Sequence, residues 1–424
     1  MTMILSAEMA RAPVRIARAA EISFACFASF VYGTQAVQML LGSTDQAAAG
    51  RPIAVHIIFL SIYALTIAAL VYDFRFLRSL ILHWPLILLL LIFPFISLFW
   101  SVRPSDTLQR AIASFGSSCF GLYLFWRFGM TIAIRILAIA MTCAAAGSLF
   151  VSLFLPQIGL MVDETWAGAW RGLYYHKNSL GASIALATIL LTYVALTDTS
   201  IFRILALCGL GICFLLLVGS RSLTAVFATG FCLALMVWGF AIQRAPRSVV
   251  VLTLISVFGC GAFLVVLMTF ASIEDAFALL GKKAGMSGRF PLWEQVTLFI
   301  GQKPWLGYGY EAFWKEDSTE TQVIAGVIKY APFYSHNGAL ETLLNGGIVL
   351  LLAVSLFMAL FAWRAWAYAR LHPLFFITTF PLVFIGFVIL ADISESHLLM
   401  RNDLIWSITL GLAMRLSLER SIRR

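Results

Sequence analysis

The chain has 424 residues, of which 61% are hydrophobic and 12% are charged, with a formal net charge of +9 and a mean hydropathy of +0.94. A soluble domain carries about a quarter charged residues, so the composition excludes a soluble fold and predicts a protein whose solvent is the bilayer. The positive charge would also suit a nucleic-acid-binding protein, but the bias for basic residues on the cytoplasmic side of membrane proteins explains it better.

A transmembrane helix needs about 20 mainly apolar residues, and about twelve stretches meet this requirement. The predicted fold is therefore an all-α integral membrane protein, with residues 1–424 forming one polytopic domain. The split between 201–219 and 222–242 is the least secure, because only Gly219-Ser220-Arg221 separates the two stretches. The stretches lie near 22–41, 53–71, 80–100, 108–126, 131–155, 179–197, 201–219, 222–242, 248–270, 338–363, 374–391 and 403–418.

The first apolar run follows Arg11, Arg15 and Arg18, as in the basic region of a signal peptide, and Ala47-Ala48-Ala49 would suit a cleavage site. The run from Ile22 to Leu41 exceeds the 7–15 residues, roughly, of a signal peptide's apolar core. An uncleaved first helix is the preferred interpretation.

Basic residues mark one side of the predicted bundle. With an even number of helices both termini share a side, and the positive-inside rule places that side in the cytoplasm. The loops 156–178 and 271–337 then face outward, away from ATP and nucleotide sugars. The basic residues concerned are Arg75, Arg78, Arg127, Arg203, Arg244, Arg247, Arg364, Arg370, Arg415, Arg420, Arg423 and Arg424.

No cofactor or metal is expected. All seven cysteines fall inside apolar stretches without a CxxC pair, which is typical of small core residues. The chain has no Walker A or HExxH pattern, and its adjacent acids Asp163-Glu164 and Glu316-Asp317 are weak metal candidates. An anionic group handled outside the membrane would have to be neutralised by Arg and Lys.

The large loop at 271–337 is the most polar part of the chain, since residues 271–336 hold 13 of the 49 Asp, Glu, Lys and Arg residues. Residues 290–300 predict a short amphipathic helix, with Pro291 in its first turn, and residues 304–310 predict a turn. The loop is expected to form a partly helical cap over a membrane groove. Trp305, Tyr308 and Trp314 would suit either a membrane-interface belt or a platform that stacks on sugars.

His336 stands where this loop enters the next apolar stretch, followed by Asn337. A histidine at the mouth of a membrane cavity can act as a general base, and the alternative is an interfacial residue or helix cap. Glu341 lies about a turn and a half further along the predicted helix, where it could orient the histidine or pair with an arginine.

Arg221 lies between two long apolar stretches, so its side chain must reach the interface or line a polar cavity. Arg289 precedes the amphipathic helix, where a solvated loop charge is the simpler interpretation. The last connection, from Asp392 to Asp403, carries Glu395, His397 and Arg401.

A second polar cluster, Arg171, His176, Lys177 and Asn178, stands at a helix entrance. Asn178 is a plausible N-cap, and two cations beside a helix N-terminus would form an anion site. The alternative is a set of basic side chains that extend to the membrane interface.

Five motifs in order resemble the O-antigen ligase and bacterial polysaccharide polymerase superfamily, and together they cover most of the chain. They are Gly172-Leu-Tyr-Tyr-His176-Lys-Asn178, Gly219-Ser-Arg221-Ser, Gly288-Arg289-x-x-Leu292-Trp293, Pro304-x-Leu-Gly307-Tyr-Gly309 and Ser335-His336-Asn337 with Gly347. The resemblance implies a GT-C-like membrane fold in the bacterial inner membrane. It also implies that the catalytic residues are His336, Arg221 and Arg289.

The resemblance further implies a glycosyltransferase that uses undecaprenyl-diphosphate-linked oligosaccharides as donor and acceptor. His336 would be the general base and the two arginines would hold the diphosphate in an inverting, metal-independent transfer. The second polar cluster, Asn337, Glu341 and the three aromatic residues would contact the saccharide or carrier. Membrane lipid, chain-length regulators and export proteins are further expected partners, and nucleic acid is not.

Two features of the resemblance favour a polymerase of repeat units. Leu350 stands where ligases often have Gly, Thr or Tyr, and the Trp-rich loop is similar to that of polymerases of exported acidic polysaccharides in soil bacteria. An O-antigen ligase, which transfers the glycan to lipid A-core, is the alternative. A transporter or flippase is less favoured, because it would place polar residues near the midplane of several helices.

Overall fold

The computed structural model describes residues 2–42, 52–162, 166–242, 289–315, 317–372 and 376–421. Within these ranges the chain is helical, and the isolated bridge between Leu160 and Trp170 is the β pairing that they contain. This agrees with the predicted all-α membrane fold. The helices are α1 (Thr2–Gly33), α2 (Ala36–Leu41), α3 (Ile53–Tyr72), α4 (Phe74–His83), α5 (Pro85–Ile96), η1 (Ser97–Phe99), α6 (Pro104–Phe154), α7 (Pro156–Gly159), α8 (Lys177–Thr197), α9 (Ile201–Ser220), α10 (Leu223–Ile242), α13 (Arg289–Gln302), α14 (Thr319–Ile328), α15 (Gly338–Leu371), η2 (Phe376–Thr379), α16 (Phe380–Ser394) and α17 (Leu404–Ser421).

Seven helical segments of the described chain are long and apolar enough to cross a membrane, or eight if the bent pair α4–α5 is one span. They are α3, α6, α8, α9, α10, α15 and η2 with α16. The prediction counted α6 as two spans, and the predicted span 248–270 lies outside the described residues. The total of about twelve spans therefore stays a prediction, while the short turn predicted after Gly219 is observed between α9 and α10.

Two of the long helices are broken at a glycine with positive φ: α6 at Gly129 (φ 69°) and α15 at Gly347 (φ 63°). At Gly347 a side chain is also excluded by space, because a Cβ would lie 2.2 Å from the carbonyl carbon of Trp305. Glycine therefore allows both the left-handed backbone and the close approach of residue 305. Directly after the break, the amide of Ile348 donates to the carbonyl of Pro304 at 2.8 Å, so α15 is joined here to the segment around residue 305.

The centre of the bundle is the tightly packed pair α6 and α17. A Cβ on Gly121 of α6 would lie 1.7 Å from the carbonyl oxygen of Ser407, and the Ser407 hydroxyl donates to the Ser117 carbonyl at 2.8 Å. Small residues that let helix backbones approach closely are typical of helix pairs in membranes.

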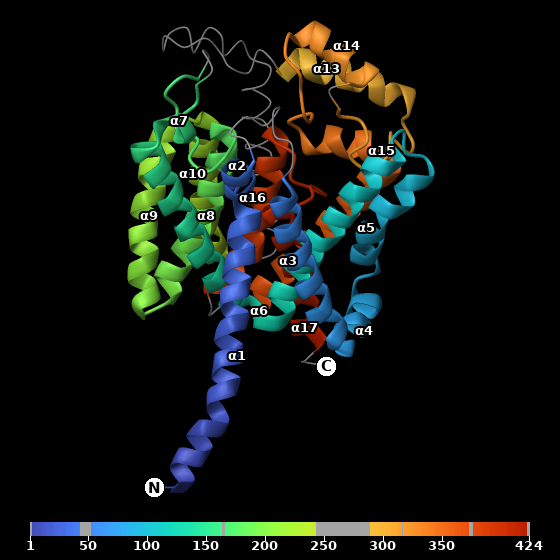
Figure 1. Ribbon diagram of the computed structural model, residues 1–424. Coiled ribbons are helices and arrows are strands. Elements are labelled where there is room, and N and C mark those ends of the chain that lie inside the picture. Colours follow the sequence, from blue (N-terminus) through green and yellow to red (C-terminus); the bar gives the residue numbers. More distant parts are fainter. Residues whose placement is uncertain are drawn as a thin grey trace.

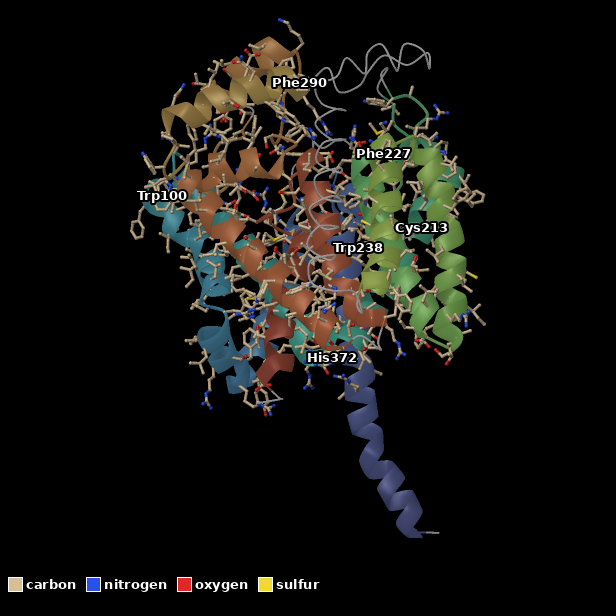
Figure 2. The ribbon with its side chains drawn as sticks, turned by 180° about the vertical axis from the view of Figure 1, so that it is seen from behind. Trp100, Cys213, Phe227, Trp238, Phe290 and His372 are labelled. Carbon is tan, nitrogen blue, oxygen red and sulfur yellow. The ribbon has the colours of Figure 1, made fainter. Side chains whose placement is uncertain are left out.

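Residues 289–337 form a folded cap, which lies at the opposite end of the molecule from both termini (Figure 1). Leu292 and Val296 of α13 pack against Phe313, Ile324 and Leu344 in a separate apolar cluster. Figure 2 shows the same polarity, with Phe290 at the cap end and His372 at the far end. The predicted helix at 290–300 is confirmed as α13, and α14 was not predicted.

The cap is anchored to the bundle by backbone contacts at its base. The amide of Val102 donates to the carbonyl of Tyr308 at 3.0 Å, and the amide of Tyr308 donates to Leu344 at 2.7 Å. The indole of Trp100 donates to the carbonyl of Leu306 at 2.8 Å. These bonds hold the cap against η1, α6 and the first part of α15.

Candidate functional site

The two ends of the cap meet at one carboxylate, that of Glu395. The Arg289 Nη2 donates to Oε1 at 3.1 Å, and the His336 Nδ1 lies 3.1 Å from Oε2. Glu395 immediately follows α16, in extended backbone, so a rigid transmembrane helix fixes its position. The structure thereby brings together two of the three residues that the resemblance assigns to catalysis.

Two further groups complete the surroundings of Glu395. The Tyr334 hydroxyl donates to Oε2 at 2.9 Å, and the Asn178 amide lies 3.5 Å from Oε1. Burial raises the pKa of Glu395, but His336, Arg289 and the Tyr334 hydroxyl outweigh it and hold this pKa well below its ordinary range. The group is therefore a carboxylate, which can only accept, so the proton of a neutral His336 lies on Nδ1 and leaves the lone pair on Nε2.

The residue before His336 is held from two sides. The backbone amide of Ser335 donates to the buried carboxylate of Glu341 at 2.9 Å, and its carbonyl accepts from the Trp293 indole at 2.8 Å. His336 itself has a φ of +53°, a left-handed conformation that is uncommon for a residue with a side chain. Glu341 thus positions the backbone that leads into the histidine, and the hydrogen bonds of its carboxylate in the described structure come from Ser335 and Trp314.

Asn337 is the N-cap of α15. Its Oδ1 accepts from the amide of Leu340 at 3.1 Å, and its Nδ2 donates to the carbonyl of Ile393 at 3.2 Å. The same side chain therefore starts α15 and ties it to the end of α16, beside Glu395. This is a positioning contact, and the helix-cap alternative considered for His336 applies to its neighbour instead.

Arg221 ends α9 in a left-handed conformation (φ +50°), and its side chain is exposed. Within the described ranges this side chain has no hydrogen bond or ion pair. The turn that carries Arg221 is nevertheless fixed near Glu395. The Ser222 hydroxyl donates to Asn178 Oδ1 at 3.2 Å, and Lys177 Nζ donates to the carbonyl of Arg221 at 3.3 Å. The third predicted catalytic residue thus connects to Glu395 through Ser222 and Asn178.

The predicted N-cap of α8 was wrong by two residues. His176 has the extended backbone of a cap, and its Nδ1 accepts from the amide of Asn178 at 3.2 Å. Because the imidazole does this, the Asn178 side chain is free to link Ser222 with Glu395.

The two cations of the second polar cluster, Lys177 and Arg171, are buried and contact other parts of the protein. Lys177 is 4% exposed, and its ammonium lies 3.6 Å from the ring centroid of Trp166. Arg171 is 8% exposed, and its Nε donates to the carbonyl of Ile158 at 2.9 Å. Lys177 therefore holds the Arg221 turn in place, and Arg171 holds α7 against the segment that leads into α8.

A cavity of about 750 Å³ lies under the cap, beside the group of side chains that surrounds Glu395. Its walls come from α1, α3, α6 and α8 together with the cap and the connection 395–403. Glu395, Tyr334 and His176 contribute to its lining, so the cluster lies at the edge of the cavity. A cavity of this size is in the usual range for a small-molecule site, roughly 300–1,000 Å³.

The three predicted aromatic residues occupy different positions. Trp314 lines the cavity, and its indole lies 3.1 Å from both oxygens of Glu341. Tyr308 is buried inside the cap, where its hydroxyl donates to the carbonyl of Phe299 at 2.9 Å. Trp305 is 67% exposed and is outside the cavity lining, so Trp314 is the one of the three that faces the cavity.

Glu395 was not predicted to belong to the site, although the sequence places it in the last connection. The sequence did contain a signal for this role, since a carboxylate at the end of an apolar span is energetically costly unless it has a partner. What the sequence did not indicate is which cation it would meet, because Arg289 and His336 lie 106 and 59 residues away along the chain.

Comparison with known proteins identifies the relatives of this chain. A sequence model of the family described as O-antigen ligase matches residues 206–355, a segment that contains Arg221, Arg289 and His336. The exopolysaccharide production protein ExoQ of Rhizobium meliloti (strain 1021) is 26% identical over 308 residues, which cover 70% of this chain and 68% of that protein. The chain is therefore similar to the O-antigen ligase family over residues 206–355, and to an exopolysaccharide production protein over most of its length.

Proposed function

We propose that the chain polymerises undecaprenyl-diphosphate-linked oligosaccharide repeat units into an exported polysaccharide at the periplasmic face of the inner membrane. The reaction is an inverting glycosyl transfer that needs no metal ion. One observation carries the proposal: the Glu395 carboxylate joins His336, a candidate base, to Arg289, a candidate diphosphate ligand, at the edge of a large cavity.

His336 is the general base of the proposed reaction. With Nδ1 donating to Glu395, the lone pair on Nε2 accepts the proton of an acceptor hydroxyl. The hydroxyl oxygen then forms a bond to the anomeric carbon of the donor sugar, while the bond from that carbon to the diphosphate oxygen breaks. The bonding electron pair leaves with the diphosphate, and attack opposite this bond inverts the anomeric centre.

Arginines stabilise the leaving diphosphate. Arg289 uses one N–H towards Glu395 and has further donors for a phosphate oxygen, whereas the Arg221 guanidinium is exposed beside the cluster. Such contacts strengthen as negative charge develops on the leaving group. Lys177 and Arg171 contribute indirectly, because they fix the turn and the loop that hold Arg221 in position.

The distribution of basic residues supports this orientation of the protein in the membrane. The N-terminus, the C-terminus and α4 with Arg75 and Arg78 lie at the end opposite the cap (Figure 1). The positive-inside rule assigns this basic end to the cytoplasm. The cap and cavity then face the periplasm, where carrier-linked saccharides are available and nucleotides are not. Trp314 provides an aromatic surface for sugars on the cavity wall.

An O-antigen ligase is the second candidate, and the description of the matching family favours it. The two functions share the donor and differ in the acceptor. Purified protein should be incubated with a carrier-linked repeat unit, with and without lipid A-core. A ladder of products without core supports the polymerase, and a product that requires core supports the ligase.

The base assignment is tested by His336→Ala in the same assay. We expect the rate of elongation to fall by about 10²–10⁴-fold, the usual contribution of a general base. Elongation at the wild-type rate would refute the assignment. Neighbouring genes provide an independent check, since genes for exported-polysaccharide assembly favour a polymerase and genes for lipopolysaccharide core favour a ligase.

A further inference from the structure

A second histidine–carboxylate pair lies in the same cavity, and the proposed reaction does not use it. The Nδ1 of His397 lies 3.0 Å from Oδ2 of Asp403, and both residues contribute to the cavity lining. The pair belongs to the connection between α16 and α17, as Glu395 does. One short segment therefore presents two histidine-binding carboxylates to the cavity.

The position of the His397 ring is fixed at both ends of this connection. Asp392 of α16 accepts the backbone amides of His397 and Leu398, at 2.8 and 3.1 Å. The other oxygen of Asp403 accepts the amide of Trp406 at 2.7 Å and so caps α17. Leu399 has a positive φ of 60°, a strained conformation of the kind that gathers at functional sites.

His397 presents a proton that lacks an acceptor. Burial lowers its pKa, but Asp403, Asp392 and Glu395 outweigh this and raise the pKa to about 8. At neutral pH the ring is therefore an imidazolium, and its Nε2 carries a proton. The Nε2 atom is buried and has no hydrogen-bond partner within the described ranges, which is costly for a charged donor.

We propose that His397 is a saccharide-binding residue that donates from Nε2 to an uncharged oxygen of the carrier-linked glycan, with Asp403 as its positioning residue. The inference rests on the proposed function, since it assumes that a carrier-linked saccharide fills the cavity. A hydroxyl, ring or acyl oxygen fits better than a carboxylate, because Asp403, Asp392 and Glu395 already surround the imidazolium with negative charge.

The test measures the affinity of detergent-purified protein for two probes. One probe is undecaprenyl diphosphate, and the other is the carrier-linked oligosaccharide extracted from cells that lack this gene. His397→Gln should weaken binding of the sugar-bearing probe roughly 10- to 100-fold and leave the sugar-free probe unchanged. Binding of the sugar-free probe also shows that the variant is folded.

Two further variants sharpen the test. In Asp403→Asn the amide oxygen can keep the cap on α17 while the NH2 group faces Nδ1, so the ring loses its charge but still donates from Nε2, and the sugar-bearing probe should weaken selectively by a smaller factor. His372→Gln is the matched control, because His372 lies at the end of the molecule opposite the cap (Figure 2) and does not line this cavity. It should bind both probes as the wild type does.

The outcomes separate the subsite from the proposed function. If His397→Gln binds both probes normally, or weakens both equally, the saccharide-binding role is refuted. If Arg221→Gln and Arg289→Gln leave both affinities unchanged, the proposed diphosphate site is refuted instead. In that case, the affinities of His397→Gln for the sugar-bearing and the sugar-free probe still test the role of His397.

Discussion

Replacing Glu395 with glutamine should abolish most of the activity without changing the size of the side chain. The carboxylate accepts from Arg289 on Oε1 and from His336 and Tyr334 on Oε2. Glutamine offers one acceptor and one donor. Arg289 can only donate, so the amide oxygen will turn towards it and the amide nitrogen towards His336. Nδ1 must then accept, which moves the ring proton to Nε2, where the base needs its lone pair.

The magnitude follows from this change of tautomer. A histidine base held in the wrong tautomer loses about 10⁴ in turnover in serine proteases, and general base catalysis as a whole contributes about 10²–10⁴. We therefore expect elongation by Glu395→Gln to slow by about 10²–10⁴-fold, which corresponds to roughly 3–5 kcal/mol in the activation free energy. The affinity for undecaprenyl diphosphate should change little, because Arg289 keeps an acceptor and Arg221 does not contact Glu395.

The assay is single-turnover elongation of a carrier-linked repeat unit by protein in lipid nanodiscs. Glu294→Gln is the matched control, since Glu294 is exposed on α13 in the same cap. An exposed substitution of this kind should alter the rate by no more than about twofold. If Glu395→Gln elongates at the rate of the control, the carboxylate does not orient the base, and the proposed mechanism fails at its central contact.

Three further results are expected. Arg221→Gln should keep the wild-type thermal stability and weaken binding of undecaprenyl diphosphate about tenfold or more, because the side chain is exposed and makes no hydrogen bond or ion pair with the described residues; unchanged affinity would refute its role. Gly347→Ala should lower the stability by about 2 kcal/mol or more, in a thermal unfolding assay, because its φ is +63° and a Cβ would overlap the cap backbone. Gly326→Ala, with open space around it, should not lower the stability. The effects of Arg289→Gln and Glu395→Gln on the elongation rate should be non-additive, because the two side chains share one contact; additive effects would mean that they act separately.

The sequence predicted the parts of the site that depend on local pattern. The apolar stretches predicted the helices, and the interruption of this pattern after residue 270 predicted where polar chemistry would gather. Arg289 and His336 stand at the two ends of the folded cap, so a single compact cap was enough to bring them near each other. The resemblance added Arg221, whose turn between α9 and α10 is observed at the predicted position.

What the sequence could not predict depends on contacts between distant segments. Glu395 is one of several acids in the outer connections, and only the packing of α16 against the cap selects it as the partner of His336. The N-cap of α8 was misplaced because asparagine is the commoner cap, whereas here the imidazole of His176 takes this role and Asn178 bridges two other elements. The break in α15 was equally hidden, because a helix with a glycine break has the same apolar composition as a continuous one, whereas the break of α6 at Gly129 falls between the predicted spans 108–126 and 131–155.

The arrangement of the site also suggests where its specificity lies. The segment that carries Arg221, Arg289 and His336 lies within the match to the O-antigen ligase family, and it contains the groups that would handle a carrier diphosphate and a hydroxyl proton. These steps are the same whether the acceptor is lipid A-core or a second repeat unit. Most of the cavity wall comes instead from α1, α3, α6, α8 and the connection with His397, which lie outside that segment. Binding energy that distinguishes one acceptor from another must come from groups that contact the acceptor. We therefore expect exchanges in this wall to change the acceptor, whereas exchanges at the shared residues should abolish transfer to any acceptor.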